Sequence, residues 1–407
     1  MKVAIIGAGA AGCFCAVNIK RRRQEIEVDV YEAMRRPLAK VAVTGGGRCN
    51  LTNTFAEIGD LGEAYPRGAK LMKRVFHTLD NEGTMEWFRK SGVRLTTQAD
   101  ECVFPASQDA MEIVSTLTRQ MAAAGVRLHT GKRVRALEHD GMRGRGYVMS
   151  FSDEETATAD VVVVTTGGSP TPRGVEFLSG LGLKMEPPVP SLFALELDSP
   201  GLHELSGIVV EDAVVGIAGT KLKATGALLL THFGASGPAV LKLSSYAARE
   251  LAEKSYHATL CVNWMGTERE EKVRAELETL AQQNRQKTVA NVHPRRFTQR
   301  LWEYLIERAG TSGSMRCSEL TKKHYNKMTA ILTSDTYTIG GQNRHKEEFV
   351  TCGGVSLSNI DMNTLEAKQH SGLYFAGEAL DVDAITGGFN LQAAWSMGYV
   401  VACSICG

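Results

Sequence analysis

The chain has 407 residues, of which 43% are hydrophobic and 22% charged, a composition typical of a folded globular protein with more than one domain. Lysine and arginine number 46 against 45 aspartates and glutamates, so no overall field draws the chain to nucleic acid or to an anionic membrane. The apolar stretch 3–19 contains three glycines and is shorter than the roughly 20 residues of a membrane-spanning helix. Nine scattered cysteines without a secretory signal indicate reduced thiols, and we expect a cytoplasmic protein without a membrane partner.

The N-terminal segment predicts a strand, a glycine turn, a helix and a second strand. The turn is Gly7-Ala8-Gly9-Ala10-Ala11-Gly12, and Glu32 ends the second strand 20 residues after Gly12. In this pattern Gly7 allows the tight turn, Gly9 lets the backbone approach a pyrophosphate, Gly12 lets helix and strand pack closely, and Glu32 accepts hydrogen bonds from a ribose. The segment therefore predicts a dinucleotide site, without distinguishing NAD from FAD.

A glycine-rich stretch follows, from Lys40 through Thr44-Gly45-Gly46-Gly47-Arg48-Cys49-Asn50 to Asn53. Its glycines expose backbone amides, Arg48 offers a charged fork, and Asn50 and Asn53 can fix the turn or meet the edge of a flavin. We interpret it as a loop that contacts the cofactor.

Helical patterns are predicted next at about 68–91 and 108–125, then a strand at 126–129 and a three-stranded, turn-rich region at about 132–165. The region ends in the four valines 161–164, which are typical of a buried strand. Thr165-Thr166-Gly167-Gly168 comes directly after them, where flavoproteins often bring backbone close to the dinucleotide.

The proline cluster 187–190 marks a predicted domain boundary. Short strand-like runs over 191–262 indicate a small barrel or sandwich. Helical patterns then follow at about 267–284, 294–309 and 318–332.

The stretch from Gly353 returns to strand, glycine turn and helix. It contains Gly377-Glu378, then Asp381-Val382-Asp383, then Gly387-Gly388-Phe389-Asn390-Leu391. In FAD proteins of the glutathione-reductase structural type, an acid in this position binds the ribityl and pyrophosphate region. The N-terminus of the following helix favours the negative charge of the reduced flavin. This second acid–glycine element favours FAD over NAD.

Three motifs, at 45–53, 231–238 and 372–392, resemble the BaiN/RdsA-type NAD(P)/FAD-dependent oxidoreductases, also described as aminoacetone-oxidase-type flavoproteins. The resemblance spans nearly the whole chain and implies an FAD domain interrupted by an inserted barrel-plus-helices module. Ala384 stands where relatives often have glycine, and Thr165 where alanine is more usual; we expect both changes to leave FAD binding intact.

The resemblance places the following residues in contact with FAD: Gly7, Gly9, Ala11, Gly12, Glu32, Lys40, Gly46, Arg48, Cys49, Asn50, Gly377, Asp383, Gly388, Asn390 and Leu391. The predicted cofactor set is completed by Ala10, Ala33, Thr44, Gly45, Val134, Thr166, Gly167, Glu378 and Gly387.

The predicted fold class is α/β: a split Rossmann-type, glutathione-reductase-like FAD domain with an inserted β-barrel and helical module. The predicted divisions are 1–188 (FAD domain, first part), 189–266 (barrel), 267–333 (helices), 334–345 (return strand and linker) and 346–407 (FAD domain, second part).

Catalytic side chains are not identified by the sequence, and two candidates stay open. Cys49 is either a redox thiol or a packing residue, and it lacks the paired cysteine of flavin disulfide reductases. His232 is either a substrate-facing acid or base or a structural histidine. Cys403 and Cys406 have C-x-x-C spacing but are single and terminal, so we predict unstructured or core cysteines and no metal.

The leading functional hypothesis is an FAD-dependent reductase of an enone-like or other unsaturated small molecule that uses NAD(P)H. No second glycine fingerprint is present, so the nicotinamide would visit the flavin only transiently. One alternative is an amine or aminoketone oxidase that uses oxygen. An alternative of another class is an FAD-binding sensor or RNA-associated protein without turnover, encouraged only by basic clusters at 293–296 and 322–324.

Overall fold

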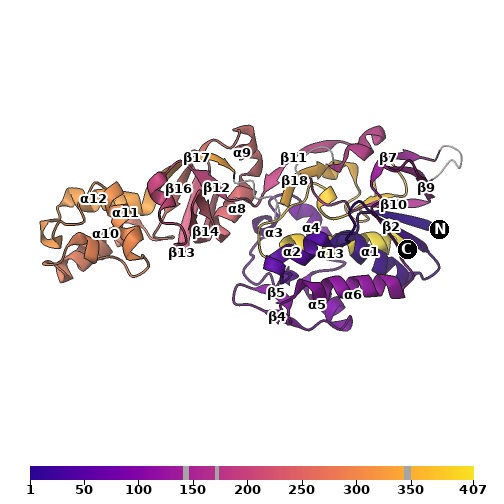
Figure 1. The fold of residues 1–407 in the computed structure, drawn as a ribbon, viewed down its shortest axis with the longest axis horizontal. Helices are drawn as coiled ribbons and strands as arrows, with labels where there is room; N and C mark the ends of the chain where they lie inside the picture. Colours follow the sequence, from indigo (N-terminus) through magenta and orange to yellow (C-terminus); the bar gives the residue numbers. More distant parts are fainter. Residues whose placement is uncertain (141–145, 170–173, 343–349) are drawn as a thin grey trace. The chain divides into compact units, whose positions relative to one another are not determined.

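The computed structural model describes residues 1–140, 146–169, 174–342 and 350–407 (Figure 1). Contacts divide the chain into two compact units, one formed by Met1–Pro190 and Glu347–Gly407 and the other by Ser191–Lys346. The first unit is thus assembled from both ends of the sequence. The predicted division at 345/346 lies outside the described residues.

A parallel sheet forms the centre of the first unit. Its strand order is β19-β10-β1-β2-β6, and all four neighbouring pairs are parallel. Read from the other edge, this is the 3-2-1-4-5 order of a Rossmann-type sheet, with the switch point between β1 and β10. The carboxyl ends of all five strands therefore meet at one edge, where a ligand is expected. The strands are β1 (Lys2–Ile6), β2 (Glu27–Glu32), β6 (Arg127–Thr130), β10 (Val161–Val164) and β19 (Leu373–Phe375).

Helices α1 (Ala10–Arg22) and α13 (Phe389–Cys406) pack against each other in this unit. Gly398 makes their close approach possible, because a Cβ there would lie 2.6 Å from the carbonyl oxygen of Ala11. Trp395 of α13 is fully buried against Phe14 of α1, with ring centroids 5.4 Å apart. The terminal cysteines lie in α13, where Cys406 is buried and Cys403 half-buried, so of the two predicted alternatives the structure favours core cysteines over unstructured ones.

The predicted helix at 68–91 is two helices. Asp80 separates them, since its carboxylate accepts a hydrogen bond from Gly83 N at 2.8 Å and caps the second helix. The remaining helices and small sheets of this unit are α2 (Ala39–Gly47), α3 (Leu61–Ala64), α4 (Ala69–Val75), α5 (Asn81–Lys90), α6 (Ala110–Ala123), the sheet of β3 (Thr52–Asn53), β5 (Cys102–Pro105) and β4 (Leu95–Thr97), the sheet of β7 (Val134–His139), β8 (Tyr147–Phe151) and β9 (Thr156–Ala159), and 3-10 turns at Glu176–Leu181, Leu357–Asn359 and Gly377–Ala379.

The proline cluster 187–190 lies within a strand rather than a linker. Strand β11 (Met185–Ser191) pairs with β18 (Val350–Val355) in a two-stranded sheet. Such a sheet consists of two edge strands, where a missing proline N–H costs little. The predicted division between 188 and 189 therefore falls inside a strand, two residues before the point at which the first unit ends, Pro190.

The second unit contains a closed six-stranded barrel in the order β12-β15-β14-β13-β16-β17. Its last strand, β17 (Asp335–Gln342), comes after the helices and pairs with β12 and β16. The strand predicted within 334–345 is thus present and belongs to the barrel, which needs it to close; the predicted barrel range 189–266 did not include it. The other strands are β12 (Leu195–Leu197), β13 (Val209–Ile217), β14 (Lys223–Thr231), β15 (Gly234–Ser236) and β16 (Ala258–Asn263), with helices α7 (Pro200–His203), α8 (Pro238–Tyr246) and α9 (Ala248–Glu253).

The three predicted helices between β16 and β17 are present. They are α10 (Glu270–Gln283), α11 (Gln299–Arg308) and α12 (Lys322–Ser334), with 3-10 turns at Val289–Asn291 and Cys317–Glu319. Trp302 is buried among them, and its indole N–H donates to the carbonyl oxygen of Val289 at 2.8 Å. No helix in the described part of the chain is long and apolar enough to cross a membrane.

Candidate cofactor site

The turn between β1 and α1 is built around its three glycines. A Cβ on Gly7, whose φ is +108°, would lie 2.4 Å from the carbonyl oxygen of Thr165, and one on Gly12 would lie 2.1 Å from the carbonyl oxygen of Gly7. A Cβ on Gly9 would meet no described atom within 4 Å. The protein's own packing thus requires Gly7 and Gly12, whereas Gly9 keeps a space open beside the turn into which a pyrophosphate fits.

The N-terminus of α1 is suited to an anion. Gly9 is its N-cap, no described side chain caps it, and its first turn, which Ala10 and Ala11 open, holds no acidic residue. The unsatisfied backbone N–H groups and the helix dipole both favour a phosphate at this end.

Glu32 ends β2 with its carboxylate held in place. Oε2 accepts a hydrogen bond from Ala8 N at 2.8 Å and Oε1 accepts one from Met34 N at 2.8 Å. Each oxygen has a second lone pair, so the carboxylate can also accept from ribose hydroxyls. Ala33 follows it and is half-buried.

Val134 approaches the same region from another segment. The carbonyl oxygen of Glu32 accepts from Lys132 N at 2.8 Å, which brings the start of β7 beside the carboxyl end of β2. Val134 opens β7 and is buried there.

Residues from three distant segments converge at the end of β10. Lys40 Nζ lies 3.3 Å from Glu378 Oε2, and a Cβ on Gly167 would lie 3.8 Å from that same oxygen. Thr351 N donates to the other oxygen, Glu378 Oε1, at 2.7 Å. Thr166, the predicted neighbour of Gly167, is exposed.

The predicted glycine loop is present at the end of α2. Thr44 leaves the helical conformation with ψ of 148°, and Gly45, Gly46 and Gly47 all have positive φ. A Cβ on Gly46 or Gly47 would meet no described atom within 4 Å, so this backbone is open to a ligand. The guanidinium of Arg48 stacks 4.5 Å from the ring centroid of Phe104.

Cys49 is fully buried beneath this loop. Burial raises the pKa of its thiol to about 12, although a hydrogen bond with Thr44 lowers it slightly. A protonated, buried thiol is neither a nucleophile nor a ready redox partner. The structure therefore favours the packing role over the redox role for Cys49.

The N-terminus of α13 meets the glycine loop. Asn50 donates its side-chain amide to the carbonyl oxygen of Thr52 at 3.0 Å and accepts from Gly388 N at 3.2 Å. Gly388 has φ of +90°, and a Cβ there would lie 2.5 Å from the carbonyl oxygen of Thr52. Gly377, at the end of β19, would place a Cβ 3.2 Å from the Cβ of Ala11. The glycine element at 377–388 thus lies beside the glycine turn at 7–12.

Two predicted residues near this helix start have internal partners. Asn390 accepts from Ala384 N at 2.9 Å and donates to the carbonyl oxygen of Ala384 at 2.9 Å. Asp383 is fully buried and forms a two-pronged ion pair with Arg67, whose Nε lies 2.6 Å from Oδ1. Gly387 accepts from Asn53 Nδ2 at 3.2 Å, and Leu391 is half-buried in the first turn of α13.

Sequence reasoning missed Arg67 and Thr351 as parts of this site, and it named Thr165 only as part of the segment that follows the valine strand. Thr165 donates its hydroxyl to the carbonyl oxygens of Gly7 at 2.8 Å and Ile6 at 3.1 Å. Its place directly after the valine strand could have indicated this role, whereas no local signal marks Arg67 or Thr351.

His232 belongs to the other unit. It lies exposed between β14 and β15, with its ring 5.0 Å from that of Phe233. Its role as an acid or base stays a prediction.

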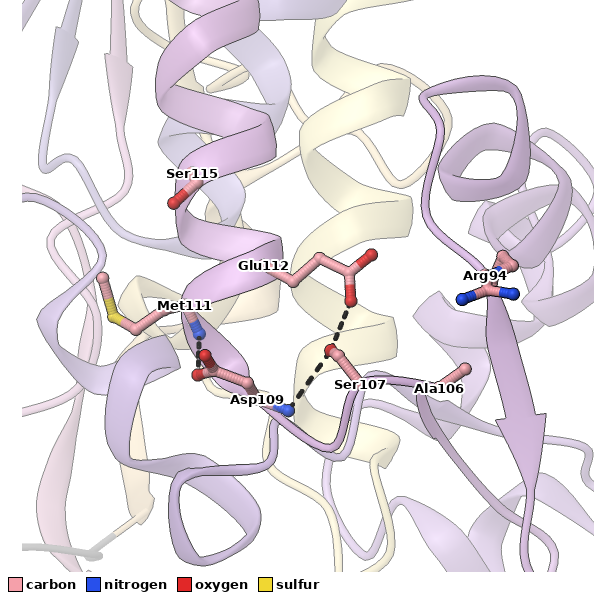
Figure 2. A pocket seen from close by; sticks show the side chains of 7 residues that line it. All are labelled: Arg94, Ala106, Ser107, Asp109, Met111, Glu112 and Ser115. Atoms are coloured by element: carbon pink, nitrogen blue, oxygen red, sulfur yellow. Dashed lines mark hydrogen bonds between the residues drawn. The ribbon is translucent and has the colours of Figure 1, made fainter.

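A surface cavity of about 470 Å³ lies at the start of α6 (Figure 2). Three of its polar side chains already have partners within the cavity wall, because Ser107 donates to Glu112 and Asp109 caps the helix through Met111 N at 2.8 Å. None of the predicted cofactor residues lines it. No group of three or more metal-ligating side chains occurs among the described residues.

The residues at the sheet edge fit FAD. The open space at Gly9, the uncapped start of α1 and the fixed carboxylate of Glu32 suit the pyrophosphate and adenosine ribose. The uncovered backbone of Gly46 and Gly47 and the start of α13 form a second half for the flavin end.

The HI0933-like protein Rossmann domain family matches residues 1–404. The chain belongs to this family. The resemblance to BaiN/RdsA-type proteins is confirmed, and so is the fold class. The protein is a flavoprotein oxidoreductase with a Rossmann-type FAD domain.

Two relatives of this protein align with it over nearly the whole chain. The 3-dehydro-bile acid delta(4,6)-reductase of Clostridium scindens is 27% identical, covering 98% of this chain and 97% of its own. The ribosomal RNA dihydrouridine synthase of Escherichia coli is also 27% identical, covering 98% and 96%. Among solved structures, 3-ketosteroid-delta4-(5alpha)-dehydrogenase from Rhodococcus jostii matches with a TM-score of 0.51 at 14% identity, covering 100% of this chain and 96% of that one. This last likeness supports the fold.

Proposed function

We propose that the protein is an FAD-dependent reductase that uses NAD(P)H to saturate a carbon–carbon double bond conjugated to a carbonyl group in a small molecule. One observation carries the proposal. Two relatives that align over nearly their full lengths are named for a reduction of this kind, on a 3-dehydro-bile acid and on uridine in ribosomal RNA. In both cases the double bond is activated by a carbonyl group, which makes it a hydride acceptor.

The chain's own residues hold and orient the cofactor in this proposal. The N–H groups at the start of α1 bind the pyrophosphate, and Glu32 binds the adenosine ribose. When bound, FAD supplies two-electron chemistry that accepts a hydride from a nicotinamide and passes one to a substrate. The N-terminus of α13, which has no acidic residue in its first turn, stabilises the negative charge of the reduced ring.

Anaerobic mixing of the purified holoprotein with NADH and, separately, NADPH tests the proposal. We expect one of the two to bleach the flavin absorption, and a 3-keto steroid with a conjugated double bond to restore it. Failure of both nucleotides would contradict the reductase. Peroxide formation with an amine or aminoketone in air, without any nicotinamide, would instead support the oxidase.

A second candidate is the same reduction on a uracil base of RNA. The observation that favours it is a local excess of positive charge in the helical part of the second unit. Residues 284–327 contain ten lysines and arginines against three glutamates, although the whole chain has a net charge of only +1. All ten cations are exposed, and among the described residues only Arg308 of the ten forms a salt bridge, with Asp335. The ten are Arg285, Lys287, Arg295, Arg296, Arg300, Arg308, Arg316, Lys322, Lys323 and Lys327.

RNA binding separates the two candidates. For the RNA candidate we expect binding to ribosomal RNA that weakens as the salt concentration rises. We also expect the double variant K322E/K323E to bind this RNA severalfold more weakly than the wild type. The matched control is K70E/K73E, which reverses two exposed lysines of α4 in the first unit. Binding that responds equally to both variants, or no binding at 50 mM salt, would leave the small-molecule reductase.

A further inference from the structure

Asp383 carries a buried charge beside the start of α13. Its side chain is 0% exposed, and that of its partner Arg67 is 12% exposed. Arg67 donates Nε to Oδ1 at 2.6 Å and Nη2 to Oδ2. A carboxylate without such a partner costs several kcal/mol to bury, so Arg67 stabilises Asp383 in this position.

The backbone around Arg67 follows the segment that leads into α13. Arg67 and Asp383 form an antiparallel bridge, and Ile385 N donates to the carbonyl oxygen of Ala64 at 2.9 Å. Gly68 has φ of +86°, and a Cβ there would lie 2.7 Å from a methyl group of Val382. We call residues 64–68 the clamp segment.

The clamp segment also reaches the first residue of α13. The hydroxyl of Tyr65, which is fully buried, donates to the carbonyl oxygen of Phe389 at 2.9 Å. The rings of Tyr65, Phe55 and Phe389 pack together, with Phe55 and Phe389 4.9 Å apart in an edge-on arrangement. Residues 383–389 are therefore held along their length by one element.

A second set of contacts holds the same segment from residues 50–53. Asn53 donates to the carbonyl oxygen of Gly387 at 3.2 Å, and Asn50 accepts from Gly388 N at 3.2 Å. Both glycines have positive φ, of +128° and +90°, so this turn has a conformation that its own sequence does not fix. Its direction is set by the flanking contacts.

We propose that Arg67 is a positioning residue for the flavin. By fixing Asp383 with a two-pronged ion pair, it sets the direction of the Gly387–Gly388 turn and of the N–H groups at the start of α13. Those groups stabilise the negative charge of the reduced flavin, so Arg67 determines how much more tightly the protein binds reduced than oxidised FAD. The proposal rests on the FAD assignment and is independent of the substrate.

A dithionite titration of the bound flavin with a reference dye, which measures its midpoint potential, tests this role. In R67M we expect the preference for reduced FAD to fall at least tenfold. R67K keeps the charge but lacks the fork, and we expect an intermediate value. R74M is the control, since among the described residues the Arg74 side chain hydrogen-bonds only to Asn363 Oδ1, at 3.0 Å on the exposed surface, and we expect the wild-type midpoint potential.

An R67M protein that retains FAD with the wild-type midpoint potential would overturn the proposal, even if its melting temperature falls. If R67M fails to fold, R67K provides the test, and a wild-type midpoint potential in R67K contradicts the positioning role of Arg67. The titration uses neither nicotinamide nor substrate, so its result does not depend on the proposed reductase activity. A wild-type protein purified without flavin would count against the cofactor assignment instead.

Discussion

The hydroxyl of Thr165 donates to the carbonyl oxygen of Gly7 at 2.8 Å, joining the end of β10 to the glycine turn after β1. Thr165 N also donates to the carbonyl oxygen of Ile6 at 2.8 Å. The two central strands are thus tied together at the switch point of the sheet, directly beneath the expected pyrophosphate.

Replacing Thr165 by valine keeps the shape and removes the donor. We expect a loss of about 1–2 kcal/mol in the free energy of unfolding, because a buried carbonyl oxygen loses a partner. Urea unfolding of the apoprotein measures it. Thr166→Val is the matched control, since Thr166 is exposed, and an equal loss in both variants would contradict the role of Thr165.

Alanine substitutions at Gly9 and Gly12 distinguish an effect on cofactor binding from an effect on folding. Gly12→Ala places a methyl group 2.1 Å from the carbonyl oxygen of Gly7, so we expect a destabilisation of about 1–3 kcal/mol. Gly9→Ala places a methyl group in open space, and we expect unchanged apoprotein stability with FAD affinity reduced tenfold or more, about 1.4 kcal/mol. Melting curves and FAD titrations of both variants provide the measurement. Wild-type FAD affinity in Gly9→Ala would show that the pyrophosphate lies elsewhere.

Asp29 makes the stability of the first unit depend on pH. Burial alone would raise its pKa, but hydrogen bonds from Arg127 and His129 outweigh burial and hold the pKa below its usual value. A carboxylate with a lowered pKa in the folded state stabilises the protein at neutral pH and loses that contribution as pH falls through the folded-state pKa. We expect Asp29→Asn to cost roughly 1–3 kcal/mol near pH 7.

The difference in the free energy of unfolding between wild type and Asp29→Asn should shrink steadily below about pH 4, the region in which the carboxyl of the unfolded chain takes up its proton. Denaturant unfolding from pH 7 to pH 3 measures it. A difference that stays constant over this range would mean that Asp29 acts by packing and not by charge.

Cys49 should be chemically silent in the folded protein. Its thiol is buried and its pKa is raised to about 12, so almost no thiolate exists at pH 7. We expect Cys49→Ser to leave the rate of flavin reduction within about twofold, with the loss limited to stability. Stopped-flow reduction with the preferred nicotinamide checks this, and a rate reduced a hundredfold would restore the redox role.

The parts of the site that the sequence predicts are those defined by neighbours in the chain. Gly7, Gly9, Gly12 and Glu32 lie in one strand–helix–strand unit, where each residue's role follows from the geometry of the unit itself. The helices of the second unit were predicted for a similar reason, because their apolar periodicity is local.

The parts that escaped prediction depend on distant partners. Arg67 and Asp383 are separated by 316 positions, and nothing near either residue indicates the other. The assignment of β17 to the barrel likewise depends on its pairing with β12 and β16. The prolines of β11 lie where the first unit gives way to the second, but they conceal a strand because proline disfavours strands in general, and only the pairing with β18 shows why they are tolerated here.

The pairing of β11 with β18 has a consequence for how the protein could diversify. A Cβ on Gly353 of β18 would lie 2.4 Å from the carbonyl oxygen of Pro187 in β11, so the chain leaves and re-enters the FAD-binding unit at adjacent points. The FAD-binding unit itself holds these two points together, and a turn of a few residues would close it. We therefore expect that a change in the length of the segment between these two points leaves the residues of the cofactor site in place.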